Sequence, residues 1–125
     1  MRTLKNSNIA ELYGVYETEN SLYLSMEEVQ GITLDTFLKR NKQTTISQRR
    51  KIMKGLLNGL KELTKQKIIH RDLKPENIIV SENIENVKIV DFGLATFIDE
   101  PKYIYVRCGT PGFVAPEILN IKDQS

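Results

Sequence analysis

The residues that could do chemistry are concentrated in one stretch, residues 70–77, which reads His-Arg-Asp-Leu-Lys-Pro-Glu-Asn. It contains two carboxylates, two cationic side chains, one amide and the only histidine of the chain. Short apolar runs at 68–69 and 78–80 flank it, and such runs are typical of buried segments. We therefore expect these polar side chains to lie on a loop whose two ends are anchored in the core.

A further carboxylate, Asp91, follows a second apolar run at 87–90. We expect this run to pair with residues 78–80 as a hairpin. Such pairing would bring Asp91 back beside Asn77, so that two oxygen-bearing side chains converge. Carboxylate and carbonyl oxygens are the ligands that Mg²⁺ prefers, usually together with phosphate oxygens. The pattern therefore predicts a magnesium site.

Three motifs together resemble those of the protein kinases. Residues 70–77 match the catalytic loop of that family, and residues 91–93, Asp-Phe-Gly, match its metal-binding triplet. Residues 115–117, Ala-Pro-Glu, match the end of the activation segment. One triplet alone would be weak evidence for the family, because short motifs recur by chance. An eight-residue match to the catalytic loop with two further motifs in register is strong evidence.

The resemblance implies an α+β fold, namely a fragment of the two-lobed protein kinase domain over residues 1–125. Residues 1–26 would form the small-lobe hairpin region, residues 27–31 the hinge, and residues 32–125 part of the large lobe. The family's glycine-rich loop, small-lobe lysine and C-terminal helices have no match, and no Gly-x-Gly occurs in the sequence. We therefore expect this chain alone to be poorly stable or aggregation-prone.

Composition limits the remaining classes of protein. The 125 residues are 40% hydrophobic and 27% charged, which is ordinary for a globular protein with a small core. The net charge of +2 is too small to favour nucleic acid or an anionic membrane as a partner. Because Cys108 is the single cysteine, we expect a reducing compartment, by default the cytoplasm. No signal peptide is visible, and no apolar stretch approaches the roughly 20 residues that span a bilayer.

Hydrophobic patterning predicts the elements that position the loop. The segments 12–17 and 22–26 are rich in Leu, Val and Tyr and flank a polar turn, which indicates an antiparallel hairpin. Residues 32–40 are expected to form a short helix. The apolar set of this helix comprises Ile32, Leu34, Phe37 and Leu38.

The clearest helix is predicted at residues 47–66, with Ser47 as its N-cap. Apolar residues recur there at helical spacing and define one buried face. That face comprises Ile52, Met53, Leu56, Leu57, Leu60 and Leu63. Gly55 and Gly59 each cost about 1 kcal/mol relative to alanine, so we expect a neighbouring element to pack closely against them. The basic residues of this helix are expected to be solvated.

In the kinase interpretation, Asp72 accepts the proton of the substrate hydroxyl, and Lys74 places an ammonium group near the transferred phosphate. A lysine at this position resembles serine/threonine kinases, because tyrosine kinases usually differ there. Asn77 and Asp91 would hold Mg²⁺. The competing structural interpretation makes Asp72 and Lys74 a buried ion pair and Asn77 a capping amide.

Nucleotide binding is implied by the same resemblance. Met26 is similar to the gatekeeper at the back of the adenine pocket, and Ile79 resembles the apolar floor under the base. Glu27, Glu28 and Val29 resemble the hinge, whose backbone would hydrogen-bond the adenine edge. The full ATP-binding set is Met26, Glu27, Val29, Glu76, Asn77, Ile79 and Asp91. Without the downstream motifs, a plain hairpin ending in solvated glutamates would be the simpler interpretation.

The segment 94–114 resembles the activation segment. Arg71 resembles the arginine that pairs with a phosphorylated residue there, while Gly109 and Thr110 belong to the loop that receives the substrate. The Thr110 hydroxyl would be available to the catalytic base. Val106 stands where many relatives carry a phosphorylatable threonine, which excludes activation by phosphate at that position.

Two scaffold residues and three functions complete the expectations. His70 is expected to be a packed residue with Phe92 stacked near it and Leu12 extending the same apolar column.

One function is a serine/threonine protein kinase that uses ATP and Mg²⁺ on a protein substrate. The others are a catalytically inactive kinase-like fragment or pseudokinase binding module, and an interaction domain unrelated to kinases. Turnover of ATP compared with an Asp72→Asn variant distinguishes the first from the rest.

Overall fold

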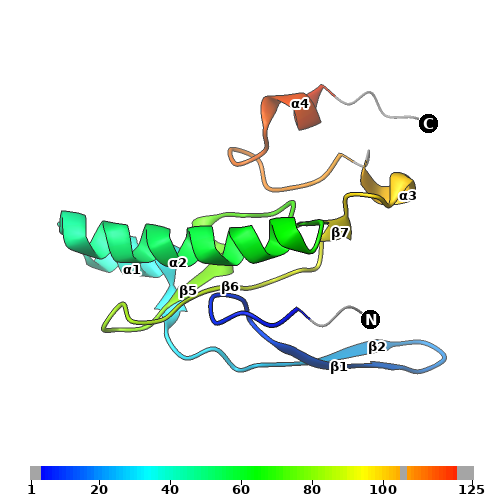
Figure 1. Ribbon diagram of the computed structural model, residues 1–125, viewed down its shortest axis with the longest axis horizontal. Helices are drawn as coiled ribbons and strands as arrows, with labels where there is room; N and C mark the ends of the chain where they lie inside the picture. The colour runs from blue at the N-terminus through cyan, green and yellow to red at the C-terminus, as the bar shows by residue number, and fades with distance from the viewer. Residues whose placement is uncertain (1–3, 105–106, 121–125) are drawn as a thin grey trace.

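A three-stranded antiparallel sheet packed against a long helix forms the core (Figure 1). The computed structural model describes residues 4–104 and 107–120. The strand order is β3 (Ile32–Thr33), β5 (Ile78–Val80), β6 (Val87–Ile89). The pairing of β5 with β6 confirms the hairpin expected at 78–80 and 87–90.

Helix α2 (Ile46–Lys65) packs along β6 and begins slightly earlier than predicted. Its N-cap is Thr45, so the assignment of Ser47 as the cap was wrong. Thr45 Oγ1 accepts a hydrogen bond from Gln48 N (3.1 Å), and Gln48 Oε1 accepts one from Thr45 N (2.9 Å). This reciprocal capping box satisfies two backbone donors at once, which places the start of the helix before Ser47.

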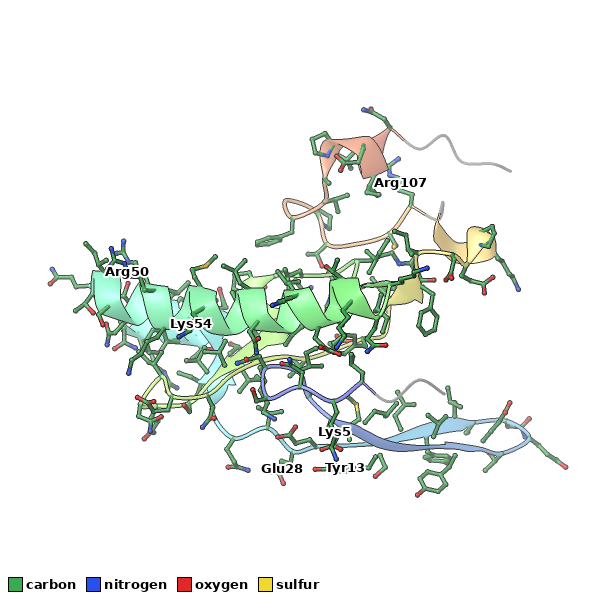
Figure 2. All side chains as sticks on the ribbon, viewed as in Figure 1. Lys5, Tyr13, Glu28, Arg50, Lys54 and Arg107 are labelled. Carbon is green, nitrogen blue, oxygen red and sulfur yellow. The ribbon has the colours of Figure 1, made fainter. Side chains whose placement is uncertain are left out.

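The buried face of α2 is narrower than predicted. Ile52, Leu56 and Leu63 are buried, but Met53 is 51% exposed and Leu57 is 60% exposed, so their assignment to the core was wrong. Spacing alone defines an apolar arc of the helix, while the covered width depends on what packs there. The sheet covers one stripe and leaves Met53 and Leu57 beside it; Figure 2 shows the side chains along α2, with Arg50 and Lys54 labelled.

The close approach expected at the two helix glycines is confirmed. A Cβ atom on Gly55 would lie 2.8 Å from Val87 Cβ, and one on Gly59 would lie 3.0 Å from Asn8 O. Real Cβ atoms rarely make such contacts, so any larger residue would force the helix away from β6 and from the segment before the hairpin. The two glycines therefore lower the helix propensity of α2 but allow it to pack closely against its neighbours.

The predicted hairpin forms with the expected bounds, β1 (Leu12–Glu17) and β2 (Leu22–Met26). The strands are antiparallel, with Val15 opposite Leu24 and Tyr16 opposite Tyr23. In Figure 1 the hairpin lies along the lower edge of the molecule, away from α2. Side chains on both of its faces are exposed.

The segment that precedes the hairpin is bound to β6. Ile89 N donates to Asn8 O (2.9 Å), and Ala10 N donates to Ile89 O (2.9 Å). Ile9 is fully buried there and forms an isolated parallel bridge with Ile89. The segment thus adds an extended edge to the core before the chain turns into β1.

The region predicted as one helix at 32–40 divides into β3 and α1 (Leu34–Arg40), because Thr33 caps the helix through Thr36 N. Leu34 and Phe37 are buried, whereas Leu38 is 43% exposed, so its place in the apolar set was wrong. The remaining elements are β4 (Ile68–Ile69), η1 (Pro75–Asn77), β7 (Thr96–Phe97), α3 (Pro101–Ile104) and α4 (Pro116–Leu119). Strands β4 and β7 pair with each other. Among the described residues, no helix combines the length and apolarity needed to cross a membrane.

Candidate active site

The loop 70–77 is held in place by a buried histidine. His70 Nδ1 accepts a hydrogen bond from Asp72 N (3.2 Å), and His70 Nε2 donates to Val90 O (2.9 Å). The two contacts together select the tautomer that carries hydrogen on Nε2. The Phe92 ring packs edge-on against His70, with 4.9 Å between ring centroids. The predicted scaffold role of His70 and its stacking with Phe92 are confirmed.

Asp72 lies at the centre of a hydrogen-bond network. Thr110 Oγ1 donates to Asp72 Oδ1 (2.5 Å), and Lys74 Nζ donates to the same Thr110 oxygen (2.6 Å). Lys74 Nζ also lies 3.6 Å from Asp72 Oδ2. Asn77 Nδ2 donates to Asp72 O (2.8 Å) and to Asp72 Oδ2 (3.2 Å). A carboxylate, an ammonium group and a hydroxyl therefore meet within hydrogen-bond distance.

The hydrogen bond from Thr110 is the main cause that lowers the pKa of Asp72. Partial burial acts in the opposite direction, while Lys74 and Asn77 lower the pKa further. Asp72 is therefore ionised at neutral pH and presents an acceptor to a hydroxyl group. The same contacts form the ion pair and the capping amide of the structural interpretation, so the side chains can hold the loop and also act in it.

Asn77 and Asp91 are brought into proximity by the pairing of β5 with β6. Val90 N donates to Asn77 O (2.9 Å), so the residue next to Asp91 is bonded directly to Asn77. Because Asn77 Nδ2 binds Asp72, its Oδ1 atom is the end of the amide that suits a cation. Asp91 is exposed, and its Oδ1 accepts from Gly93 N (3.1 Å).

One carboxylate and one amide oxygen fit Mg²⁺ when phosphate oxygens supply further ligands. Within residues 4–104 and 107–120, no cluster of three or more His, Cys, Asp or Glu side chains is placed to hold a metal ion by itself.

A cavity of about 980 Å³ lies between the hairpin and the sheet. Five of the predicted nucleotide-binding residues line it: Met26, Glu27, Val29, Ile79 and Asp91. Ile79 and Asp91 come from the core side, while the first three come from the end of β2 and the following segment. Glu76 is exposed on η1, and neither it nor buried Asn77 is part of the lining.

Sequence reasoning missed other residues of this cavity, including Leu24 and Ala10. Leu24 could have been found, because it alternates with Met26 along β2 and alternate residues share a face. Leu12 lines the same cavity as Phe92, in keeping with the expected apolar column. The ion pair between Lys88 and Glu27 was also missed, since no local pattern joins them.

Three residues of the segment 94–114 contact the loop 70–77, namely Leu94, Gly109 and Thr110. Arg71 has a φ of 67° and donates from Nε to Leu94 O (2.5 Å). Gly109 has a φ of 119°, and a Cβ atom there would lie 3.1 Å from Arg71 O, so glycine suits this contact on both counts. Val106 lies outside the described residues.

Comparison with known proteins agrees with this geometry. The family model described as "Protein kinase domain" matches residues 1–125, and the chain belongs to the protein kinase family. Its α+β structure is accordingly a fragment of the two-lobed kinase fold.

Among the similar proteins, serine/threonine-protein kinase atg1 of Dictyostelium discoideum is 38% identical over 128 residues, covering 98% of this chain and 19% of the relative. Serine/threonine-protein kinase DCLK3 of Mus musculus is 39% identical over 125 residues, covering 98% of this chain and 16% of the relative. A probable serine/threonine-protein kinase 2 of Plasmodium falciparum is 39% identical over 121 residues, covering 95% of this chain and 24% of the relative. The chain thus spans less than a quarter of the length of these proteins.

Proposed function

We propose that this chain is the central part of a serine/threonine protein kinase, which transfers the γ-phosphate of ATP to a hydroxyl group of a protein substrate. One observation carries the proposal. The Thr110 hydroxyl lies between the Asp72 carboxylate and the Lys74 ammonium group, so these two groups can hold an alcohol between them. A substrate hydroxyl needs the same two partners.

In this mechanism the substrate hydroxyl donates its hydrogen bond to Asp72. Its oxygen forms a bond to the γ-phosphorus while the bond from that phosphorus to the bridging oxygen breaks, and ADP leaves. The hydroxyl proton passes to Asp72, and the Lys74 ammonium group stabilises the negative charge on the transferred phosphoryl group. Mg²⁺, held by Asn77 and Asp91, would neutralise phosphate charge.

The cavity supports a site for the nucleotide. Ile79 and Met26 supply apolar surface for the adenine ring, and the volume of about 980 Å³ is that of a ligand pocket. Glu27 N already donates to Glu11 O (2.8 Å), so the Glu27 carbonyl and the backbone of Val29 are the proposed partners of the adenine edge. The cavity lies where residues 1–26 and 32–125 face each other, in keeping with a hinge at 27–31.

Serine/threonine specificity is proposed on two grounds. Lys74 is the residue that resembles this class, and the three relatives above carry this class in their names. The hydrogen bond from the Lys74 ammonium group to the Thr110 hydroxyl, beside Asp72, supports a site for an aliphatic alcohol. A protein substrate would approach along the segment that contains Gly109 and Thr110.

The test is ATP turnover with Mg²⁺ and a serine/threonine peptide mixture, comparing the unmodified chain with Asp72→Asn. We expect turnover to fall by about 10²–10⁴-fold, the usual contribution of a general base. Asp35→Asn, which alters an ion pair with Lys39 on α1, serves as the matched control and should retain turnover. Equal background in the unmodified chain and in Asp72→Asn would contradict the proposal and favour an inactive kinase-like module.

A further inference from the structure

The chain makes an unusual set of contacts at Glu27, where β2 ends and the segment 27–31 begins. Lys88 Nζ on β6 donates to both carboxylate oxygens of Glu27, at 2.7 Å and 2.8 Å. Glu11 N donates to Glu27 Oε2 (3.1 Å), and Glu27 N donates to Glu11 O (2.8 Å). One residue thus joins three separate parts of the chain.

The contacts of Glu27 extend a set of hydrogen bonds that attaches one wall of the cavity to β6. The segment 8–10 is bonded to β6 by the Asn8 and Ala10 contacts with Ile89, and Asn8 Nδ2 also donates to Val87 O (2.8 Å). Glu27 continues this attachment from Glu11 across to Lys88. The wall formed by Met26 and Val29 is therefore tied to the strand that leads into Asp91.

The ion pair between Lys88 and Glu27 is partly shielded from solvent, so it can contribute to the stability of this attachment. The side chains of Lys88 and Glu27 are 18% and 23% exposed, whereas those of the Lys51–Glu85 pair are 52% and 59% exposed. Exposed pairs contribute little because water and salt screen them. When a partly buried carboxylate loses its cation, nothing offsets the cost of its desolvation. The side chain then turns toward water to be solvated again.

We propose that Glu27 and Lys88 are positioning residues that hold the segment 27–31 against β6 and so fix the width of the nucleotide cavity. This inference rests on the proposed function, since the cavity is taken to bind a nucleotide. Neither side chain is assigned to the reacting atoms. Their effect is to keep Met26 and Val29 at a set distance from Ile79 and Asp91, so that the ligand does not have to order the wall when it binds.

The sharpest variant is Lys88→Met, because Lys88 is not part of the binding surface and methionine retains much of the side-chain length. Glu27 would lose its two strongest contacts and release Glu11 N. We expect the Kd for Mg-ATP to rise by about threefold to tenfold, a modest loss of the kind expected when a residue acts through a neighbouring element. Phosphoryl transfer at saturating ATP should change by less than about twofold, because Asp72 and Lys74 are untouched.

Three comparisons separate positioning from other effects. Lys88→Arg keeps a cation that can bind both carboxylate oxygens, so this variant should bind Mg-ATP with the affinity of the unmodified chain. Lys51→Met removes an exposed pair of similar length and should leave affinity unchanged. Adenosine serves as an uncharged probe: a positioning role weakens adenosine and Mg-ATP by the same factor, whereas loss of long-range attraction weakens Mg-ATP alone.

Titrations of the 125-residue chain and these variants with Mg-ATP and with adenosine would decide the question. Unchanged adenosine affinity in a folded Lys88→Met variant would overturn the inference. Hydrogen exchange tests the attachment in the absence of nucleotide. Lys88→Met should speed exchange at the amides of Glu11 and Glu27, and Lys51→Met should not. If the unmodified chain binds neither ligand, the proposed function fails and the link to the cavity fails with it. The exchange rates would still support or refute the attachment of 27–31 to β6.

Discussion

The hairpins β1–β2 and β5–β6 differ in what covers them. The hairpin β5–β6 lies under α2, and Val80 and Ile89 within it are 0% exposed. The hairpin β1–β2 has similar pairing, yet Tyr16 is 63% exposed and Leu24 is 54% exposed. Strand pairing satisfies the backbone in both, but the covered hairpin removes far more of its apolar surface from water.

This difference divides the candidate site. Asn77 and Asp91 flank the covered hairpin, so packing fixes their positions. Met26 and Val29 follow the uncovered hairpin, whose placement depends on polar contacts at its base, chiefly those of Glu27. The chemical groups are thus held by apolar packing, while the wall of the nucleotide cavity is held mainly by the polar contacts of Glu27 and should loosen first when those contacts are removed.

The largest contrast is expected when one apolar side chain is truncated in each hairpin. Ile89→Ala should lower the free energy of unfolding by about 2–5 kcal/mol, because it opens a cavity in the core. Leu24→Ala should change it by about 0.5 kcal/mol or less, since the side chain is already largely in water. Urea denaturation of both variants measures the difference. Equal losses would show that the outer hairpin is as well packed as the inner one.

A second contrast uses added rather than removed volume. Gly55→Ala places a methyl group 2.8 Å from Val87 Cβ and should cost about 1–2 kcal/mol, even after the gain in helix propensity. Gly14→Ala, in β1, meets only the movable ring of Tyr16 at 3.2 Å and should be close to neutral. Thermal melting of the two variants tests this. A stabilised Gly55→Ala variant would contradict the close contact between α2 and β6.

The start of α2 provides a smaller and more local test. Thr45→Ala removes the capping hydroxyl and should cost about 1 kcal/mol. Ser47→Ala lies inside the first turn, where alanine is the better helix former, and should be neutral or slightly stabilising. Denaturant titration of the pair distinguishes a cap at Thr45 from a cap at Ser47. The reverse order of effects would restore the original assignment.

The smallest effect concerns pH at the base of the uncovered hairpin. The hydrogen bond from Lys88, then that from Glu11 N, lowers the pKa of Glu27, and partial burial opposes them. Glu11 and Lys5 are further charged groups there, with Lys5 Nζ 3.8 Å from Glu11 Oε1. Because the folded-state pKa is lowered, the stabilisation is complete above the usual glutamate pKa of about 4.3 and is lost as pH falls through the folded value.

Lys88→Met should therefore be less stable than the unmodified chain near pH 7, and the gap should narrow as the solution is acidified below about pH 4. Denaturation at a series of pH values measures it, with Lys51→Met as the control. A gap that is constant with pH would mean that the Glu27 carboxylate gains nothing from its cation.

Local patterns in the sequence were sufficient for several elements. The bounds of β1 and β2 followed from a polar turn between β-prone segments, and the position of residues 70–77 between β4 and β5 followed from the apolar runs on either side. The error at Ser47 arose because the nearest polar residue was preferred to the Thr45–Gln48 pair, whose spacing is the stronger signal.

Other features depend on contacts that no local pattern contains. Met53 and Leu57 were assigned to the core because periodicity gives the direction of an apolar arc but not the width of the surface that covers it. Lys88 and Glu27 are 61 positions apart, and each is unremarkable alone. A lysine within the apolar run 87–90 was the one available hint that a carboxylate lies opposite.

The two glycines of α2 have a mechanical consequence. Most helices rest on a sheet through layers of side chains, which can rearrange and absorb a displacement. At Gly55 and Gly59 the helix contributes no side chain to that layer, so the Val87 and Ile89 side chains of β6, the strand that runs toward Asp91, lie close to the helix backbone. The far end of the same helix continues through β4 to the loop that contains Asp72. A shift of α2 would therefore act on Asp91 through these close contacts with β6 and on Asp72 through the continuous chain.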